Sequence, residues 1–162
     1  MQTAICPGSF DPITLGHVDV ITRASKLFER VVVCVVANAN KKTLLTLEER
    51  IDYVRRVTAH LPNVEVDSWN GLLVEYAARY ENPVVVRGLR AVSDFEYEFM
   101  MALTNKKLDP RVETVFLASD EKYTYLSSSG VKEIAYFGGD ISQFMPAEIL
   151  ADLQEKIDRR IK

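Results

Sequence analysis

Glycine, hydroxyl and imidazole groups lie close together in the segment Pro7-Gly8-Ser9-Phe10-Asp11-Pro12-Ile13-Thr14-Leu15-Gly16-His17. Gly8 allows a tight turn, Ser9 offers a hydroxyl and an amide, and Gly16 lets a ligand approach the backbone closely. His17 falls in the first turn of an expected helix, where unpaired amides and the positive dipole end favour phosphate. The segment predicts a phosphate site with His17 as a donor. Alternatively, the glycines only form turns and His17 only caps the helix. The pattern is neither a P-loop nor G-x-G-x-x-G.

Cationic side chains follow two other apolar runs. Lys41 and Lys42 come after the run that ends at residue 36, and Arg87-Gly88-Leu89-Arg90 follows directly on the run 84–86. Arginine presents forked, permanently charged donors that suit phosphate. The alternatives are a solvated lysine pair and a structural ion pair between an arginine and Glu96 or Glu98.

A fourth polar segment, Tyr123-Thr124-Tyr125-Leu126-Ser127-Ser128-Ser129, precedes a short expected helix. Its serines offer hydroxyls and free amides for a second anion site, or serve as ordinary N-caps. The chain contains no H-E-x-x-H, no G-x-S-x-G and no carboxylates at metal-ligand spacing. We therefore expect neither a metal ligated by protein side chains nor a covalent nucleophile. His60 is expected to be exposed at a helix end.

These segments are placed by an alternation of strand and helix patterns along the whole chain. The continuous β-branched run 31–36 is typical of a strand buried on both faces of a parallel sheet. Two capping boxes, Thr46 to Glu49 and Ser93 to Glu96, predict helix starts. The expected strands are 3–6, 31–36, 64–66, 84–86 and 114–118. The expected helices are one with Val18, Ile21, Ala24, Leu27 and Phe28 at helical spacing, two over 47–60 and 72–80, one with Phe95, Phe99, Ala102 and Leu103 inward, one from Ser127 to Ile134, and a last one with Ile149, Leu150, Leu153, Ile157 and Ile161 inward.

Strands that alternate with helices indicate an α/β fold with an open parallel sheet covered on both faces. Right-handed crossovers leave few doubly wound orders. We expect a Rossmann-like, doubly wound five-stranded parallel sheet in the order 3-2-1-4-5, followed by C-terminal helices. In such a sheet ligands bind beyond the carboxyl ends of the strands, at the point where the winding reverses. Here that point lies between the first and fourth strands, where the four polar segments should meet.

Composition limits the possible functions. The chain has 162 residues, 48% of them hydrophobic, and a formal charge of −3. This size fits a single domain over residues 1–162, and the charge argues against sequence-independent binding to nucleic acid. Cys6 and Cys34 lie in apolar runs and are expected to be buried free thiols. We see no signal peptide, and the longest apolar run, residues 31–37, is too short to span a bilayer. We expect a cytoplasmic protein without nucleic-acid or membrane partners.

The first segment, with Thr14-Leu15-Gly16-His17, resembles the T/H-x-G-H signature of the nucleotidyltransferase superfamily. Together with Arg87-Gly88-Leu89-Arg90, Asp94-Phe95-Glu96-Tyr97-Glu98 and the serine run before Val131-Lys132-Glu133, it resembles the bacterial phosphopantetheine adenylyltransferases over essentially the whole chain. The resemblance implies transfer of the adenylyl group from ATP to 4′-phosphopantetheine, giving dephospho-coenzyme A and pyrophosphate. It further implies Mg²⁺ held mainly by the ATP phosphates, coenzyme A as a feedback ligand, and a homohexamer.

The resemblance also implies roles for individual residues. His17, Lys41 and Arg90 match the catalytic set, and Ser9, Lys41, Leu73 and Arg87 match phosphopantetheine contacts. The positions that match ATP contacts are Ser9, Phe10, His17, Gly88, Leu89, Arg90, Glu98, Tyr123, Thr124, Tyr125, Leu126, Ser127, Ser128 and Ser129. Many relatives carry threonine in place of Ser9, which keeps the hydroxyl. A relative carries arginine in place of Tyr136, so no role is transferred to that residue.

Three competing classes remain open. The first is a nucleotidyltransferase for another acceptor, such as nicotinamide mononucleotide or glycerol phosphate. The second is a non-catalytic nucleotide sensor, which the complete set of His17, Lys41 and Arg90 disfavours. Class I tRNA synthetases share the first motif, but this chain lacks their second lysine loop and has no room for a tRNA-binding domain.

Overall fold

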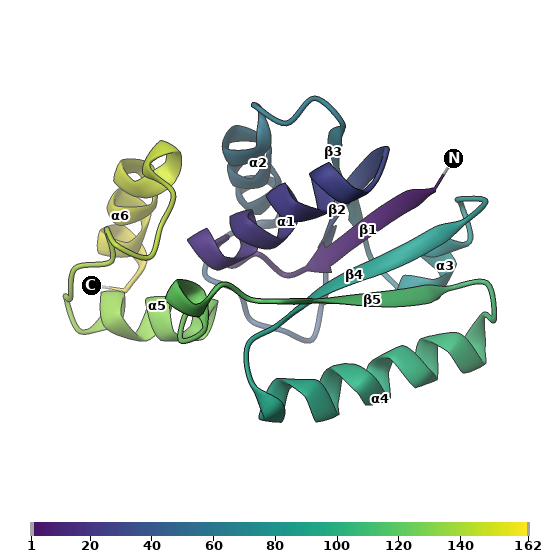
Figure 1. Cartoon of the computed structure of the whole chain (residues 1–162). Coiled ribbons are helices and arrows are strands. Elements are labelled where there is room, and N and C mark those ends of the chain that lie inside the picture. The colour runs from purple at the N-terminus through teal and green to yellow at the C-terminus, as the bar shows by residue number, and fades with distance from the viewer. Residues whose placement is uncertain (1, 162) are drawn as a thin grey trace.

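The computed structural model describes residues 2–161, without the side chains of residues 92 and 93. Its five parallel strands are β1 (Thr3–Gly8), β2 (Arg30–Val36), β3 (Val64–Trp69), β4 (Pro83–Leu89) and β5 (Glu113–Ala118). They form one sheet in the order β3-β2-β1-β4-β5, which confirms the predicted order (Figure 1). The helices are α1 (Leu15–Leu27), α2 (Leu47–Thr58), α3 (Leu73–Ala77), α4 (Val92–Leu108), α5 (Ser128–Tyr136) and α6 (Ala147–Ile161), with a 3₁₀ turn at Glu121–Tyr123.

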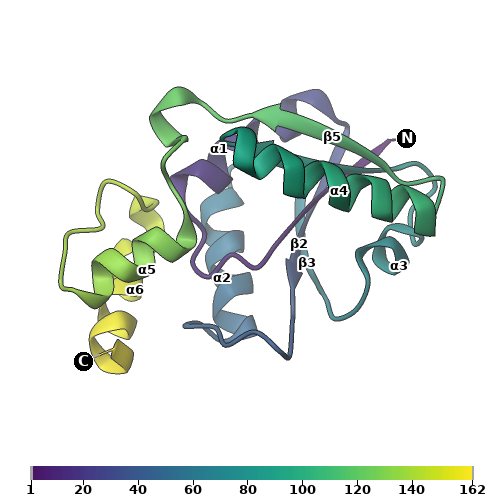
Figure 2. The same ribbon diagram turned by 90° about the horizontal axis from the view of Figure 1, so that it is seen from below.

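The two faces of the sheet bury alternate residues of each strand, as the pleat requires. Ala4 and Cys6 belong to the larger core, which α1, α2, α5 and α6 also line, whereas Ile5 belongs to a smaller core under α3. Helices α3 and α4 lie on the opposite side of the sheet from α1 and α2 (Figure 1). In both views α5 and α6 lie together at the end of the molecule away from the N-terminus, beyond the carboxyl ends of the strands (Figures 1 and 2).

One of the two predicted capping boxes is confirmed. Thr46 Oγ1 accepts the Glu49 amide at 3.2 Å, and a carboxylate oxygen of Glu49 accepts the Thr46 amide at 2.9 Å. The prediction of Ser93 as an N-cap was wrong, because the helix begins at Val92 and its N-cap is Ala91. The Ser93 side chain itself lies outside the described residues. Strand β3 runs three residues further than predicted and α3 is shorter, since local polarity is a weak guide to where pairing ends.

The inward face predicted for α4 was wrong for three of its four residues. Phe95, Phe99 and Leu103 are 44%, 43% and 50% exposed, and Ala102 is half-buried, whereas Glu98 is 9% exposed. Asp94, Glu98, Ala102 and Asn105 recur at helical spacing and face the rest of the molecule. The spacing of apolar residues along a helix identifies its apolar face but not the surface that covers this face. In α4 the apolar face points away from the rest of the chain.

Strands β1 and β4 separate before either one ends. They pair only from Thr3 with Pro83 to Ile5 with Val85. Beyond this point β1 stays paired with β2 as far as Gly8, and β4 stays paired with β5 as far as Leu89. The separation opens a crevice at the position predicted for the ligand site.

Candidate nucleotide-binding site

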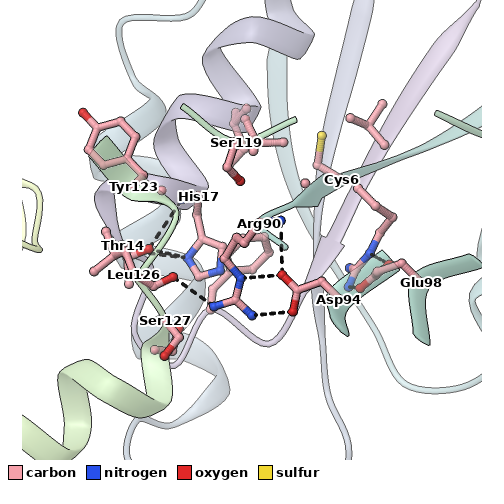
Figure 3. A pocket seen from close by; sticks show the side chains of 18 of the residues that line it. Cys6, Thr14, His17, Arg90, Asp94, Glu98, Ser119, Tyr123, Leu126 and Ser127 are labelled. Carbon is pink, nitrogen blue, oxygen red and sulfur yellow. Dashed lines mark hydrogen bonds and ion pairs between the residues drawn. The ribbon is translucent and has the colours of Figure 1, made fainter. Parts of the chain in front are cut away.

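A cavity of about 300 Å³ occupies the crevice between β1 and β4 (Figure 3). It is lined by residues from both strands, the N-terminal part of α1, the start of α4 and the segment before α5. The predicted site residues that line it are Phe10, His17, Arg87, Gly88, Arg90, Glu98, Tyr123, Leu126, Ser127, Ser128 and Ser129. Segments separated by more than a hundred residues in sequence therefore meet here, as predicted.

His17 is both a capping residue and a cavity residue. Its amide is 3.4 Å from the N-cap Thr14 Oγ1, and the Thr14 amide donates to His17 Nδ1 at 3.0 Å. Because Nδ1 accepts a hydrogen bond, the ring proton of the neutral imidazole lies on Nε2. Burial, together with the charges of Arg87 and Arg90, lowers the pKa of His17 to about 4. The side chain is thus a neutral donor at pH 7, and no described residue bonds to Nε2.

The ring of Phe10 packs against the imidazole of His17. The backbone of Phe10 has a φ of +48°, a conformation that residues other than glycine seldom adopt, and its ring is 4% exposed. The two ring centroids are 5.2 Å apart in an edge-to-face arrangement. The strained backbone therefore turns an aromatic ring inward against the functional group.

Arg90 joins α4 to the segment before α5. Its guanidinium donates to Asp94 at 2.9 and 3.2 Å and to the Leu126 carbonyl at 3.0 Å (Figure 3). Arg90 lies just before the N-cap of α4, and its backbone amide also donates to Asp94, at 3.1 Å. Arg90 therefore reaches the cavity in a fixed orientation, with part of its charge already balanced.

The three serines combine capping with cavity lining. Ser127 Oγ accepts the Gly130 amide at 3.0 Å, which makes Ser127 the N-cap of α5, and Ser128 Oγ donates to the Pro12 carbonyl at 2.8 Å. The N-cap reading is therefore confirmed for Ser127, and the anion site stays a prediction. The N-terminus of a nine-residue helix faces the cavity, an arrangement that suits an anion.

Gly88 forms part of the cavity floor and packs closely on α1. A Cβ added at this position would lie 2.9 Å from Val20 Cγ2. A larger residue here would require either the Val20 side chain or the β4 backbone to shift. Glycine at position 88 therefore also suits the packing of β4 on α1.

A second cavity of about 340 Å³ adjoins the first. It is lined by Ser9, Leu73 and apolar residues of α4, and it shares Pro7, Arg87 and Glu98 with the first cavity. Glu98 accepts from Arg87 Nε at 2.7 Å and from its Nη2 at 2.6 Å, and Arg87 Nη1 donates to the Pro7 carbonyl at 2.8 Å. Burial is the largest single effect on Arg87 and lowers its pKa, but the hydrogen bonds and the negative charge of Glu98 together outweigh burial and raise the pKa of the guanidinium.

This ion pair is the structural alternative that the sequence left open for Arg87. It does not remove Arg87 from the site, because the pair forms the boundary between the two cavities. Arg87 also bridges β4 to the end of β1 where the strands separate.

The remaining predicted residues lie further out. Lys41 is exposed and lines neither cavity, but its Nζ lies 3.5 Å from Ser9 Oγ. Leu89, Thr124 and Tyr125 also line neither cavity, and Tyr125 is 69% exposed. Their predicted nucleotide contacts stay predictions. His60 and Tyr136 are exposed, the former as predicted.

Sequence reasoning missed the polar groups that support the site. Asp11 is 2% exposed and accepts the amides of Leu44 and Leu45 at 2.9 Å each and the ammonium of Lys132 at 3.0 Å. Arg50 donates to the carbonyls of Ser9 and Val36, at 2.8 and 3.1 Å. Their partners lie 14 to 121 residues away in the chain, so no local pattern could reveal them.

Other chemistries find little support in the part of the chain that the structure describes. No three His, Cys, Asp or Glu side chains within residues 2–161 come together as a metal site. Cys6 and Cys34 are buried and free, as predicted, and burial raises the pKa of each thiol to about 12. A thiol at such a pKa is a poor nucleophile at neutral pH. None of the helices in this range has the length and apolar character needed to cross a membrane.

A doubly wound parallel sheet with a polar crevice at its switch point and a helix N-terminus facing that crevice is typical of the α/β proteins that bind nucleotides. Residues 5–134 match the cytidylyltransferase-like family model. The chain is 54% identical to phosphopantetheine adenylyltransferase of Caldanaerobacter subterraneus subsp. tengcongensis, over 98% of this chain and 99% of that protein. It is 53% identical to the protein of the same name from Heliobacterium modesticaldum, over 96% and 93% of the two chains.

The chain therefore belongs to the phosphopantetheine adenylyltransferase family. A solved structure from Vibrio parahaemolyticus, provisionally assigned as a nicotinate-nucleotide adenylyltransferase, is 19% identical and superposes with a TM-score of 0.66, covering 98% of this chain and 95% of the other. This likeness supports the fold.

Proposed function

We propose that the chain transfers the adenylyl group of ATP to 4′-phosphopantetheine in a reversible reaction, giving dephospho-coenzyme A and pyrophosphate. The observation that carries the proposal is the pair of adjoining cavities. One is lined by His17, Arg90 and the start of α5, and the other by Ser9 and Leu73. Two substrates placed there would meet at the end of β1. Family membership at about 50% identity supports the assignment.

In this proposal the nucleophile is a phosphate oxygen of the acceptor, which is ionised at neutral pH and needs no general base. The protein would align this oxygen with the α-phosphorus and stabilise charge on the equatorial oxygens and on pyrophosphate. His17 Nε2–H, Lys41 and Ser9 would surround the α-phosphate. Arg90 and the start of α5 would bind the β- and γ-phosphates.

Arg87 and Leu73 would bind the acceptor, with Arg87 near its phosphate and Leu73 beside the pantetheine arm. Glu98 already accepts from Nε and Nη2 of Arg87. The guanidinium would therefore act as a donor of fixed orientation whose charge is partly neutralised. Coenzyme A contains the same arm and would compete for the second cavity.

Mg²⁺ fits the donor set only as an ion bound by phosphates and water. The cavity carboxylates Asp94 and Glu98 are each engaged by an arginine, and hard divalent cations require oxygen ligands. When bound, the ion would neutralise charge on the phosphates. The side chains of this site would orient those phosphates around it.

We also propose that the protein works as a homohexamer in the cytoplasm. The outward apolar face of α4 supports self-association, because a patch of this kind on a monomer marks an interaction site. The number six is implied by the family resemblance. Two buried free thiols are in keeping with a reducing compartment.

The test uses the purified chain with ATP, Mg²⁺ and one acceptor at a time, following the adenylylated product by mass. We expect dephospho-coenzyme A with 4′-phosphopantetheine, and little product with nicotinamide mononucleotide or glycerol 3-phosphate. Faster turnover of another acceptor would reassign the substrate. ATP binding without turnover on any acceptor would favour the sensor function.

A further inference from the structure

The loop that carries Lys41 is held at both ends and is exposed between them. At one end the Ala37 amide donates to the Trp69 carbonyl at 2.8 Å. At the other end the amides of Leu44 and Leu45 donate to Asp11. The residues from Asn38 to Lys42 are exposed, and the one hydrogen bond of the Lys41 ammonium to a described residue is the 3.5 Å contact with Ser9 Oγ. Its position therefore depends on how firmly the two ends are fixed.

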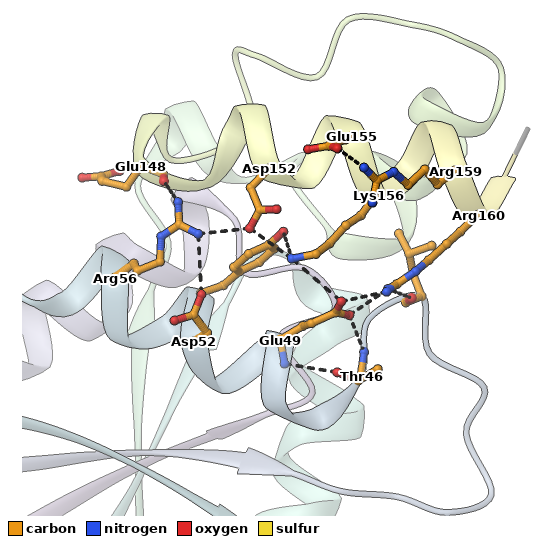
Figure 4. Close-up of polar contacts among 12 residues, drawn as sticks. Thr46, Glu49, Asp52, Arg56, Glu148, Asp152, Glu155, Lys156, Arg159 and Arg160 are labelled. Carbon is orange, nitrogen blue, oxygen red and sulfur yellow. Dashed lines mark hydrogen bonds and ion pairs between the residues drawn. The ribbon is translucent and has the colours of Figure 1, made fainter.

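The C-terminal helix supplies a second hold on the far end of this loop (Figure 4). Arg160, in the last turn of α6, donates to the Leu44 carbonyl at 3.0 Å. The same guanidinium forms two bonds of 2.7 Å with Glu49, and Glu49 accepts the Thr46 amide. Leu44 is therefore held by two hydrogen bonds. Its amide donates to the buried Asp11, and its carbonyl accepts from the more exposed Arg160.

We propose that Arg160 is a positioning residue for Lys41. By fixing Leu44 and the start of α2, Arg160 limits the motion of the loop that carries Lys41. It thereby keeps the Lys41 ammonium beside Ser9, at the edge of the proposed reaction centre. The inference rests on the proposed function, since it requires Lys41 to act on the substrate phosphates. It gives α6 a role in the reaction, although no residue of α6 lines either cavity.

The contacts of the neighbouring cations on α6 show how positioning of the Lys41 loop can be distinguished from simple attachment of α6 to α2. Arg159 is one residue away, and its side chain pairs with Glu155 on the same helix. Lys156 lies 3.8 Å from Glu49 and also pairs with Asp152. When Arg160 is replaced, Glu49 therefore keeps a cationic neighbour and α6 keeps a link to α2. The Leu44 carbonyl, in contrast, has no second donor among the side chains of the described residues.

The test compares Arg160→Gln with the matched control Arg159→Gln, using steady-state kinetics well below the unfolding temperature of each variant. We expect Arg160→Gln to lower kcat/KM for 4′-phosphopantetheine roughly 5- to 20-fold, because small misplacements of a catalytic group are costly. The KM for ATP should change little. Arg159→Gln should match the wild type, and Arg160→Lys, which can still donate to one carbonyl, should recover part of the activity.

A double-mutant cycle with Lys41→Ala distinguishes positioning from a general structural effect. Arg160→Gln should have little further effect once Lys41 is absent. Two results would overturn the positioning role and leave the proposed function standing. In the first, Arg160→Gln lowers kcat/KM by the same factor in the Lys41→Ala background as in the wild type. In the second, Lys41→Ala is impaired but Arg160→Gln behaves like Arg159→Gln. If Lys41→Ala itself has wild-type kinetics, the role of Lys41 in the proposed function fails, and the positioning role fails with it.

Discussion

The imidazole of His17 is oriented by the same contact that caps its helix. The Thr14 amide occupies Nδ1, which leaves the Nε2 proton for a ligand. The helix-cap reading is therefore confirmed for Nδ1, and the donor to phosphate in our proposal would be Nε2. This arrangement fixes the donor before the substrate arrives, which is the condition under which a hydrogen bond contributes most to catalysis.

For His17→Ala we expect kcat to fall roughly 10²–10³-fold with a smaller change in KM, as for the loss of one preorganised donor. The measurement is the steady-state rate of dephospho-coenzyme A formation. Thermal unfolding of the same variant checks that Thr14 still caps α1. Turnover at the wild-type rate would show that His17 is not a catalytic residue.

The lowered pKa of His17 also makes the stability of the free protein depend on pH. The folded value of about 4 lies below the ordinary 6.5, so the unfolded chain binds the proton more tightly. Stability is therefore lost as pH falls from about 6.5 towards 4, by roughly 1–3 kcal/mol for a cavity group that water partly reaches.

The measurement is urea unfolding at several pH values for the wild type and for His17→Gln. Glutamine at this position can still cap the helix and does not titrate. We expect the variant to lose less stability on acidification. His60→Gln is the matched control and should follow the wild type. Equal losses in wild type and His17→Gln would contradict the shifted value.

At the scale of elements, the connections that hold the site join segments distant in sequence. Asp11 fixes the loop before α2 and is itself held by Lys132 of α5. The start of α5 faces one cavity, and the loop carries Lys41 near the other. The same carboxylate therefore supports both halves of the proposed site.

For Asp11→Asn we expect a loss of about 2–4 kcal/mol in the free energy of unfolding. The amide can accept from only one of the two loop amides that now donate to it, and Lys132 loses its charged partner. Chemical denaturation measures the loss. Asp19→Asn is the control, because the pair of Asp19 with Arg23 lies at the surface and should contribute at most about 0.5 kcal/mol. Equal losses would contradict a supporting role for Asp11.

These elements also show how far the sequence predicts this molecule. The apolar run before Ala37 and the alternation of patterns predicted a parallel sheet and narrowed its strand order to a few, of which the favoured one was right. The polar segments at the strand ends predicted much of the cavity lining. The contacts of Asp11, Arg50 and Arg160 were out of reach, because they join residues that only the folded chain brings together. The end of β3 was missed because Asp67 and Ser68 look like loop residues.

At the scale of the whole molecule, α4 is turned relative to the usual amphipathic arrangement. Polar side chains such as Asp94 and Glu98 serve the site, and the rings of Phe95 and Phe99 stack on the outer side with centroids 5.5 Å apart. On the inner face of the helix, Asp94 and Glu98 pair with Arg90 and Arg87, and Ala102 and Asn105 continue the same face. The apolar residues of α4 are left for contact with another surface, which explains why the predicted inward face was wrong.

We therefore expect Met100→Glu, at a position 61% exposed on α4, to shift the protein to smaller species. A charge buried in an apolar subunit contact is strongly unfavourable. Sedimentation velocity at micromolar concentration measures the change. Leu27→Glu, at a 65% exposed position on α1, is the matched control and should sediment like the wild type. If Met100→Glu also did so, α4 would not be the contact surface.

The link between Arg87 and Glu98 has a consequence for inhibitor design. An inhibitor that spans both cavities would gain the effective concentration of two tethered fragments, and its linker would have to pass beside this ion pair and the Pro7 carbonyl. An anionic linker would meet the carboxylate of Glu98 as well as the guanidinium of Arg87. A neutral linker that accepts one hydrogen bond from Arg87 would leave the ion pair between Arg87 and Glu98 largely intact. Such a linker is therefore a better starting point than an anionic one.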